Sequence, residues 1–221
     1  MKVLVIAPHP DDEVLGCGGV MARHVAKGDD VFVLLATRGA PEFYSDEQVE
    51  STRREMLDAH RTLGVTETRF LEFPAPKLDT VAGCTIADAV GKVIADIRPQ
   101  TVYLPFPGDI HKDHQVVHEA AMVACRPVYD HRPETILCYE TLSETEWASP
   151  IGNMGFMPTY FVDIDRFLAK KLEAMQCFAS QLRDFPNPRS LGAIEHLARF
   201  RGASVNLAAA EAFVPVRQIV P

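Results

Sequence analysis

Several features that mark other classes of protein are missing from this sequence of 221 residues. Its five cysteines are odd in number and widely spaced, and no C-x-x-C pair occurs, which argues against a disulfide framework or a cysteine zinc site. Acidic residues outnumber basic ones by 30 to 22, so the chain lacks the basic excess typical of nucleic-acid-binding proteins. There is no G-x-S-x-G segment to form the nucleophile elbow of a serine hydrolase.

Long apolar runs are also absent. No segment approaches the roughly 20 apolar residues that cross a bilayer, so we expect no membrane span. The short apolar run Val3–Ala7 is soon followed by three acids, which is unlike a secretory signal peptide. We therefore expect a cytoplasmic protein.

The composition that remains is that of a folded domain. Apolar residues make up 47% of the chain and charged residues 24%, which is enough to bury a sizeable core without favouring disorder. With no repeat or low-complexity tract, the length indicates a single domain over residues 1–221.

Short apolar runs alternate with segments of helical period. This β-α alternation predicts an α/β fold: a Rossmann-like three-layer sandwich with a mostly parallel sheet covered by helices. We expect strands at 3–7, 31–36, 69–73, 101–104, 135–140 and 160–164, helices at 14–27, 46–63, 86–97, 114–124, 166–182 and about 192–200, and loops at 143–158 and 184–188.

A first polar motif follows the first predicted strand. His9 stands between two prolines, and Asp11, Asp12 and Glu13 come directly after it. In doubly wound sheets ligands bind beyond the carboxyl ends of the strands. An acidic helix N-terminus would explain the three acids, because the helix dipole favours them, but it would not explain His9.

The glycines after this motif do not form a dinucleotide fingerprint. Gly16, Gly18 and Gly19 lie too far past the strand, and Met21 occupies the place of the third glycine of G-x-G-x-x-G. We expect them to let the first helix pack closely on the sheet.

A second motif follows the fourth predicted strand. His111, Asp113 and His114 fall within four residues, at the same edge of the sheet as the first motif. Together the motifs offer two histidines and a carboxylate, the ligand pattern of a catalytic zinc site with an open position. Other divalent metals such as manganese or iron(II) would also suit it. A chance cluster of surface histidines is the alternative.

These residues resemble the PIG-L/LmbE-like family of zinc-dependent de-N-acetylases, which carries A-H-P-D-D-E after the first strand and a later H-x-D-H. Here the motifs read P-H-P-D-D-E from Pro8 and H-K-D-H from His111. The resemblance extends through most of the chain. Segments 78–80, 105–109 and 187–190 look like a bacterial subgroup often tied to surface-sugar metabolism.

The resemblance implies a role for each residue. His9, Asp12 and His114 would ligate zinc, and Asp11 would be the general base and then the acid. His111 would stabilise the oxyanion as a protonated imidazole, with Asp113 orienting or charging it, and Glu13 would support the turn. A bell-shaped pH profile follows, with Asp11 and the metal's water on the acidic limb and His111 on the basic limb.

Two positions depart from the family pattern. Thr52 stands where many members carry a substrate-binding arginine, and Arg53 or Arg54 is the candidate replacement unless both lie on a solvated helix face. Ala75 stands where many members carry a sugar-binding aspartate.

The implied substrate is a small N-acetylated amino sugar or its conjugate. The alternatives are a metal-dependent hydrolase of another amide or acyl ester, and a metal-binding protein without catalysis. No nucleic-acid partner is expected, and a homo-oligomer is compatible with the sequence.

Overall fold

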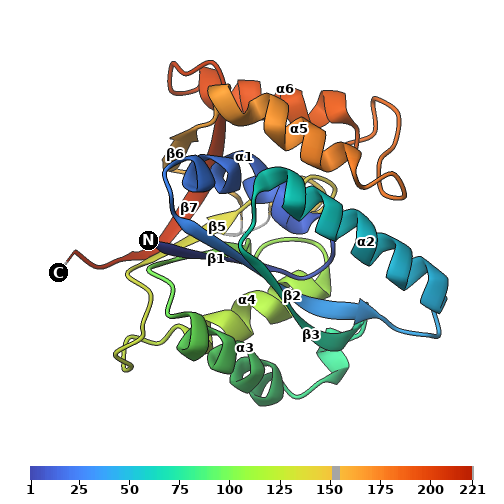
Figure 1. Ribbon diagram of the computed structural model, residues 1–221, viewed down its shortest axis with the longest axis vertical. Coiled ribbons are helices and arrows are strands. Elements are labelled where there is room, and N and C mark those ends of the chain that lie inside the picture. Colours follow the sequence, from blue (N-terminus) through green and yellow to red (C-terminus); the bar gives the residue numbers. More distant parts are fainter. Residues whose placement is uncertain (151–154, 221) are drawn as a thin grey trace.

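The computed structural model describes residues 1–150 and 155–220 and shows one seven-stranded sheet with helices on both faces (Figure 1). The α/β sandwich expected from the sequence is confirmed. The strands are β1 (Lys2–Ala7), β2 (Asp30–Gly39), β3 (Glu67–Ala75), β4 (Thr101–Pro105), β5 (Thr135–Tyr139), β6 (Tyr160–Asp163) and β7 (Ala210–Gln218). The helices are α1 (Asp12–Ala26), α2 (Asp46–Leu63), α3 (Gly83–Ile97), α4 (Lys112–Ala124), α5 (Leu168–Gln176) and α6 (Leu191–Ala203), with 3-10 turns at Leu78–Thr80 and Asp165–Phe167.

The strand order is β3-β2-β1-β4-β5-β7-β6. Strands β1 to β5 pair in parallel, whereas β7 runs antiparallel to both β5 and β6. The chain winds outward from β1 through β2 to β3 and then returns to place β4 on the other side of β1. Between β1 and β4 the winding changes direction, and such a switch point is where doubly wound sheets bind their ligands.

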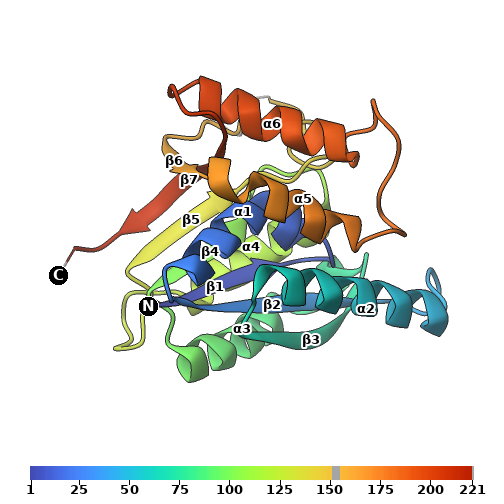
Figure 2. The same cartoon turned by 45° about the horizontal axis from the view of Figure 1, so that its top comes forward.

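Each face of the sheet has its own apolar core. Helices α3 and α4 cover one face, and α1 and α2 cover the other, with α5 and α6 outside α1 (Figures 1 and 2). Along β1, Val3 and Val5 point into the first core and Leu4 and Ile6 into the second. A strand covered on both sides has no polar face, which explains the unbroken apolar run that predicts it.

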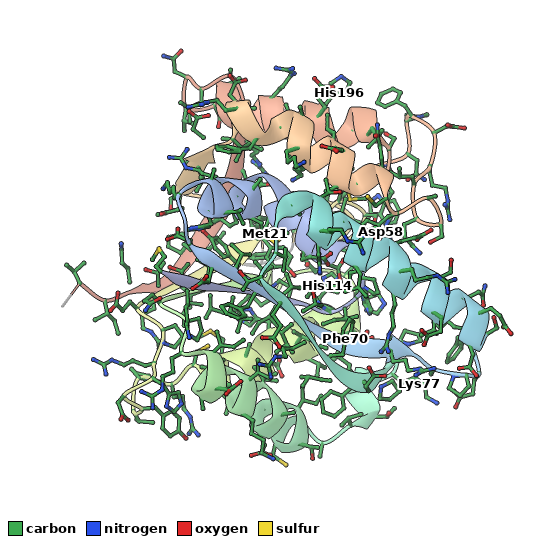
Figure 3. The ribbon with its side chains drawn as sticks, in the orientation of Figure 1. Met21, Asp58, Phe70, Lys77, His114 and His196 are labelled. Carbon is green, nitrogen blue, oxygen red and sulfur yellow. The ribbon has the colours of Figure 1, made fainter. Side chains whose placement is uncertain are left out.

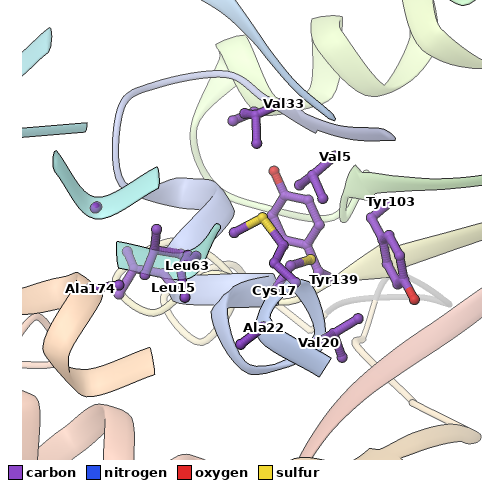
Figure 4. Close-up of a cluster of buried hydrophobic side chains, with 14 of the residues drawn as sticks. Val5, Leu15, Cys17, Val20, Ala22, Val33, Leu63, Tyr103, Tyr139 and Ala174 are labelled. Atoms are coloured by element: carbon purple, nitrogen blue, oxygen red, sulfur yellow. The ribbon is translucent and has the colours of Figure 1, made fainter. Parts of the chain in front are cut away.

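Helix α1 approaches the sheet closely because of its glycines. A Cβ atom on Gly16 would lie 2.2 Å from the ring of Tyr139, and one on Gly19 would lie 2.7 Å from Ile164. The Tyr139 ring is fully buried in the same cluster as Cys17, and its hydroxyl donates to the carbonyl of Ile6 at 2.9 Å (Figure 4). The close packing on the sheet expected of these glycines is confirmed for Gly16, whereas Gly18 faces Lys171 of α5 and Gly19 faces Ile164 just after β6.

We expect Gly16→Ala to destabilise the protein by about 1–3 kcal/mol, because overpacking shifts a ring that burial and a hydrogen bond hold in place. The matched control is Gly91→Ala in α3, where the new Cβ would meet Ala124 at an ordinary 3.9 Å. That change should be neutral or stabilising by up to about 1 kcal/mol, because alanine favours helix. Urea unfolding measures both, and equal stabilities of the two variants would contradict the packing account.

Strand β7 is the element that the sequence does not predict. Glu211 and Pro215 interrupt its apolar pattern, and each has a structural explanation. Glu211 is buried and pairs with Lys171 at 2.6 Å. Pro215 lies opposite Leu137, where the register of β5 and β7 shifts, and a bulge is a place where a strand tolerates proline.

Other differences concern element ends. The helix expected at 166–182 is a 3-10 turn followed by α5, which ends at Gln176. Most of the loop expected at 143–158 is irregular as predicted, while residues 151–154 lie outside the described part of the chain. Within the described residues, no helix combines the length and apolar character needed to cross a membrane.

Candidate metal centre and active site

The two sequence motifs meet where adjacent strands β1 and β4 end. Residue His9 follows β1, Asp12 begins α1, and His114 lies in the first turn of α4 (Figure 3). One ligand atom from each of the three lies within 4.8 Å of the others. Asp12 and His114 are fully buried, and the side chain of His9 is 21% exposed. The structure therefore brings together the three residues expected to hold a metal.

Carboxylates fix both histidine rings from behind. Asp109 lies 2.9 Å from Nδ1 of His114, which leaves Nε2 of that ring 3.2 Å from Oδ2 of Asp12. Asp113 lies 3.0 Å from Nε2 of His9. The other nitrogen of that ring, Nδ1, lies 3.4 Å from Oδ2 of Asp12. A carboxylate behind a metal-ligating histidine sets its tautomer and increases its basicity.

The unpaired atoms of the cluster fit a metal ion. Nε2 of His114, apart from its 3.2 Å ion-pair contact with Asp12, and Oδ1 of Asp12 are buried and have no hydrogen-bond partner among residues 1–150 and 155–220. Leaving such groups unsatisfied costs about 1–3 kcal/mol each, which a bound cation would remove. Two imidazole nitrogens and one carboxylate oxygen form a donor set that zinc and related divalent metals accept.

In the metal-free cluster, the neighbouring carboxylates raise the pKa of both His9 and His114. Burial alone would lower the pKa of His114, but Asp12 and Asp109 outweigh it and raise that pKa to about 10. Burial would also lower the pKa of His9, but the hydrogen bonds that its ring makes to the carboxylates of Asp113 and Asp12 outweigh burial and raise this pKa. Burial opposes the ionisation of Asp12, yet the two imidazoles hold its pKa well below the usual range.

We therefore expect metal affinity to rise with pH. Near neutral pH His114 carries a proton that a metal must displace, and the raised pKa of His9 acts in the same direction, so affinity should grow about tenfold per pH unit for each proton released. Competition against a chelator at pH 6, 7 and 8, with proton release followed by an indicator dye, measures this. An affinity that is flat over this range, with no proton released, would contradict it.

Asp11 is held in an unusual conformation beside the cluster. Its backbone has φ 107° and ψ −26°, a region that residues other than glycine rarely adopt. Its N–H donates to Oε2 of Glu13 at 3.2 Å, and Arg189 donates to its Oδ2 at 2.7 Å. Its other carboxylate oxygen, Oδ1, is buried without a partner in the described chain. Burial raises the pKa of Asp11 to about 8, against the opposing charge of Arg189.

Glu13 is supported in turn by α2. Its Oε1 lies 3.0 Å from Nε2 of His60, and Nδ1 of His60 lies 2.7 Å from the hydroxyl of Thr68 on β3. Glu13 is completely buried. The expected role of Glu13 in stabilising the turn agrees with these contacts, which extend from the Asp11 backbone into the sheet.

His111 differs from its expected state. The backbone N–H of Asp113 donates to its Nδ1 at 3.1 Å, so that atom is an acceptor and the ring proton belongs on Nε2. The carboxylate of Asp113 instead contacts His9 and the backbone N–H of Leu78. Burial, followed by the charge of His9, lowers the pKa of His111 to about 4. His111 is therefore neutral near pH 7 and still a donor through Nε2, and the basic limb of a pH profile should not come from it.

The cluster opens into a cavity of about 650 Å³ between the motifs, α2 and the loop after α5. Of the two candidate arginines, Arg53 lines the cavity, paired with Glu72 and stacked over Phe70, whereas Arg54 is exposed and does not. Thr52 and Ala75 also line it. Other lining residues include Arg38, Tyr44, Gln48, Glu144, Ser180, Arg183 and Arg189.

Two contributors to the site were not recognised as such in the sequence. Asp109 and Arg189 lie in segments that resemble a bacterial subgroup, but neither segment has a spacing that assigns a role. Asp109 also accepts a hydrogen bond from Thr145 at 2.6 Å, which ties the loop after β5 to His114. Only the fold places Arg189 beside a residue 178 positions away in sequence.

Known proteins resemble this chain in sequence and in fold. Over 183 residues the chain is 31% identical to the "Uncharacterized deacetylase YaiS" of Escherichia coli (strain K12), covering 79% of this chain and 88% of that protein. It is 30% identical over 154 residues to the "Probable N-acetyl-alpha-D-glucosaminyl L-malate deacetylase 2" of Bacillus subtilis (strain 168), covering 65% and 70%.

Among solved structures, GalB, the 4-carboxy-2-hydroxymuconate hydratase of Pseudomonas putida KT2440, superposes with a TM-score of 0.80. The alignment covers 100% of this chain and 98% of that one at 20% identity, so this likeness shows the fold alone. The model of the PIG-L family, described as GlcNAc-PI de-N-acetylase, matches residues 4–125, which is more than half of the chain and includes both motifs. The chain belongs to the PIG-L family.

Proposed function

We propose that this protein is a metal-dependent hydrolase that removes the N-acetyl group from an amino sugar or an amino-sugar conjugate, with zinc as the metal. The observation that carries the proposal is the cluster of His9, Asp12 and His114 beside the unpaired oxygen Oδ1 of Asp11. A metal ligand set and a carboxylate with one unpaired oxygen beside the same cavity are the parts that amide hydrolysis requires.

Each residue has a task in this proposal. A divalent cation bound to the three ligands would supply Lewis acidity, lowering the pKa of water and polarising a carbonyl oxygen. Asp11 accepts a proton from the attacking water on Oδ1 and later delivers it to the departing amine. His111 lines the cavity and donates from its neutral Nε2–H to the oxygen that gains charge in the tetrahedral intermediate.

The family and the two curated relatives support an N-acetylated sugar as substrate, since their names specify deacetylases and N-acetylglucosaminyl groups. GalB shows that the same fold also carries a hydratase, so fold by itself does not choose the reaction. A hydrolase of another amide or ester remains the alternative enzyme. A protein that only binds metal would not need Asp11 or His111, and both are present.

A substrate panel tests the proposal. Purified, metal-loaded protein is incubated with N-acetylglucosamine, its glycosides, nucleotide sugars and thiol-sugar conjugates, and with acyl esters of matched size. Free amine should be produced from at least one N-acetylated sugar conjugate, with the esters turned over less than about a hundredth as fast. Preferred turnover of the esters would favour the alternative hydrolase.

The cytoplasmic location, the single-domain organisation and a homo-oligomeric state stay predictions from the sequence.

A further inference from the structure

Arg189 reaches the site from a segment that neither motif includes. It lies in the loop between α5 and α6, and its side chain is 23% exposed. Its Nη1 donates to Oδ2 of Asp11 at 2.7 Å, and its Nε donates to the hydroxyl of Ser143 at 2.8 Å. The guanidinium is therefore held on two sides, between the turn after β1 and the loop after β5.

The second anchor is itself constrained. Ser143 is 5% exposed and has φ 72°, a left-handed conformation that residues with a side chain rarely adopt. Its N–H donates to Glu146 at 2.6 Å. Glu144, the next residue, lies 3.7 Å from Nη2 of Arg189. The loop after β5 thus places the hydroxyl of Ser143 and the carboxylate of Glu144 beside the guanidinium of Arg189.

The ion pair with Arg189 makes the two oxygens of the Asp11 carboxylate different. Oδ2 is committed to Arg189, whereas Oδ1 is buried and has no hydrogen-bond partner within the described residues. Because the Asp11 backbone is also fixed through Glu13, rotation of the side chain is the freedom that remains. A salt bridge on one oxygen removes that freedom and presents the other.

We propose that Arg189 is a positioning residue, which holds Oδ2 of Asp11 so that Oδ1 is the oxygen that takes the proton from the attacking water. This inference rests on the proposed function, because Asp11 is a base only in a hydrolase. Arg189 acts through Asp11 and need not contact substrate, although it lines the cavity. Small losses of orientation at a reacting group can cost about 100-fold in rate.

A double-mutant cycle tests this role, using the substrate found in the panel. We expect Arg189→Ala to lower kcat by about 10- to 100-fold, with KM changed less than about threefold, because orientation is lost and not substrate binding. Metal content should stay at that of the wild type. Residues that act as a unit are not additive, so in an Asp11→Asn background Arg189→Ala should lower kcat no further.

Three further measurements separate positioning from a structural role. Arg189→Lys keeps the charge and should recover part of kcat, and free guanidinium should partly rescue Arg189→Ala but not Arg189→Ala/Asp11→Asn. The matched control is Arg199→Ala, which removes an exposed arginine that pairs with Glu195 on α6 and should leave kcat unchanged.

The proposal is overturned by additive effects in the Asp11→Asn background, by a rise in KM with kcat unchanged, or by Arg189→Lys and guanidinium both failing to restore rate. Failure of the proposed function would look different. In that case Asp11→Asn alone would retain the wild-type rate, or no N-acetylated sugar would be turned over.

Discussion

Replacing Asp11 with asparagine is expected to reduce the deacetylation rate by about 100- to 10,000-fold, the usual share of a general base. The amide keeps the shape of the carboxylate but cannot accept the proton of water on Oδ1. Arg189 and Glu13 continue to hold the turn, because their contacts involve the other oxygen and the backbone. The metal should therefore be retained, since Asp11 is not among the proposed ligands.

The same substitution elsewhere is the control for this prediction. Asp58→Asn changes an exposed carboxylate on α2, paired with Arg61, and should leave both rate and metal content unchanged (Figure 3). Asp12→Asn should behave in the opposite way to Asp11→Asn and lose metal. If Asp11→Asn lost the metal while Asp12→Asn kept it, the two adjacent aspartates would have exchanged roles.

Replacing His114 with alanine is expected to remove both metal and activity. His114 is one of only three expected protein ligands, and the loss leaves Asp12 and His9 as an incomplete site. Oδ2 of Asp109 would also lose its partner in a buried position, so some stability should be lost as well, on the order of 1–3 kcal/mol. Metal content by mass spectrometry, rate and urea unfolding are measured on one preparation.

His114→Asn guards against a general loss of structure, because its amide can still bond Asp109. It too should lose metal while the far-ultraviolet circular dichroism stays that of the folded protein. His196→Ala removes an exposed histidine on α6 and should change neither metal content nor rate (Figure 3). Full metal occupancy in folded His114→Ala would exclude His114 as a ligand.

The proximity of the proposed metal ligands could be predicted from the sequence because parallel strands leave their carboxyl ends at one edge. The apolar runs at β1 and β4 predict two neighbouring strands, and each is followed directly by a cluster of histidines and acids. Local sequence therefore places His9, Asp12 and His114 near one another, and the structure adds the separations.

Contacts between distant segments could not be predicted in the same way. Arg189 meets Asp11 across 178 positions, and Lys171 meets Glu211 between α5 and β7. Such pairs depend on how loops and outer helices pack, which no local period encodes. The buried pair also explains the missed strand, because a charged residue interrupts the apolar pattern that predicts β7.

The state of His111 shows a second limit of sequence reasoning. Its position two residues before Asp113 indicated a charged pair, yet a residue that caps a helix turns its side chain toward the backbone N–H groups of the first turn. Nδ1 of His111 thus faces the Asp113 N–H, and the Asp113 carboxylate faces His9. Residue spacing gives proximity, while the direction of each side chain comes from the backbone.

The central claim is that a metal held by His9, Asp12 and His114 enables this chain to cleave an N-acetyl amide. The most direct test follows acetate and free amine together, with one N-acetylated sugar conjugate, in chelator-stripped protein before and after one equivalent of zinc is added. The account predicts no turnover in the stripped protein, and equimolar acetate and amine once zinc is restored. Undiminished turnover in the stripped protein, or consumption of the substrate without acetate, would contradict it.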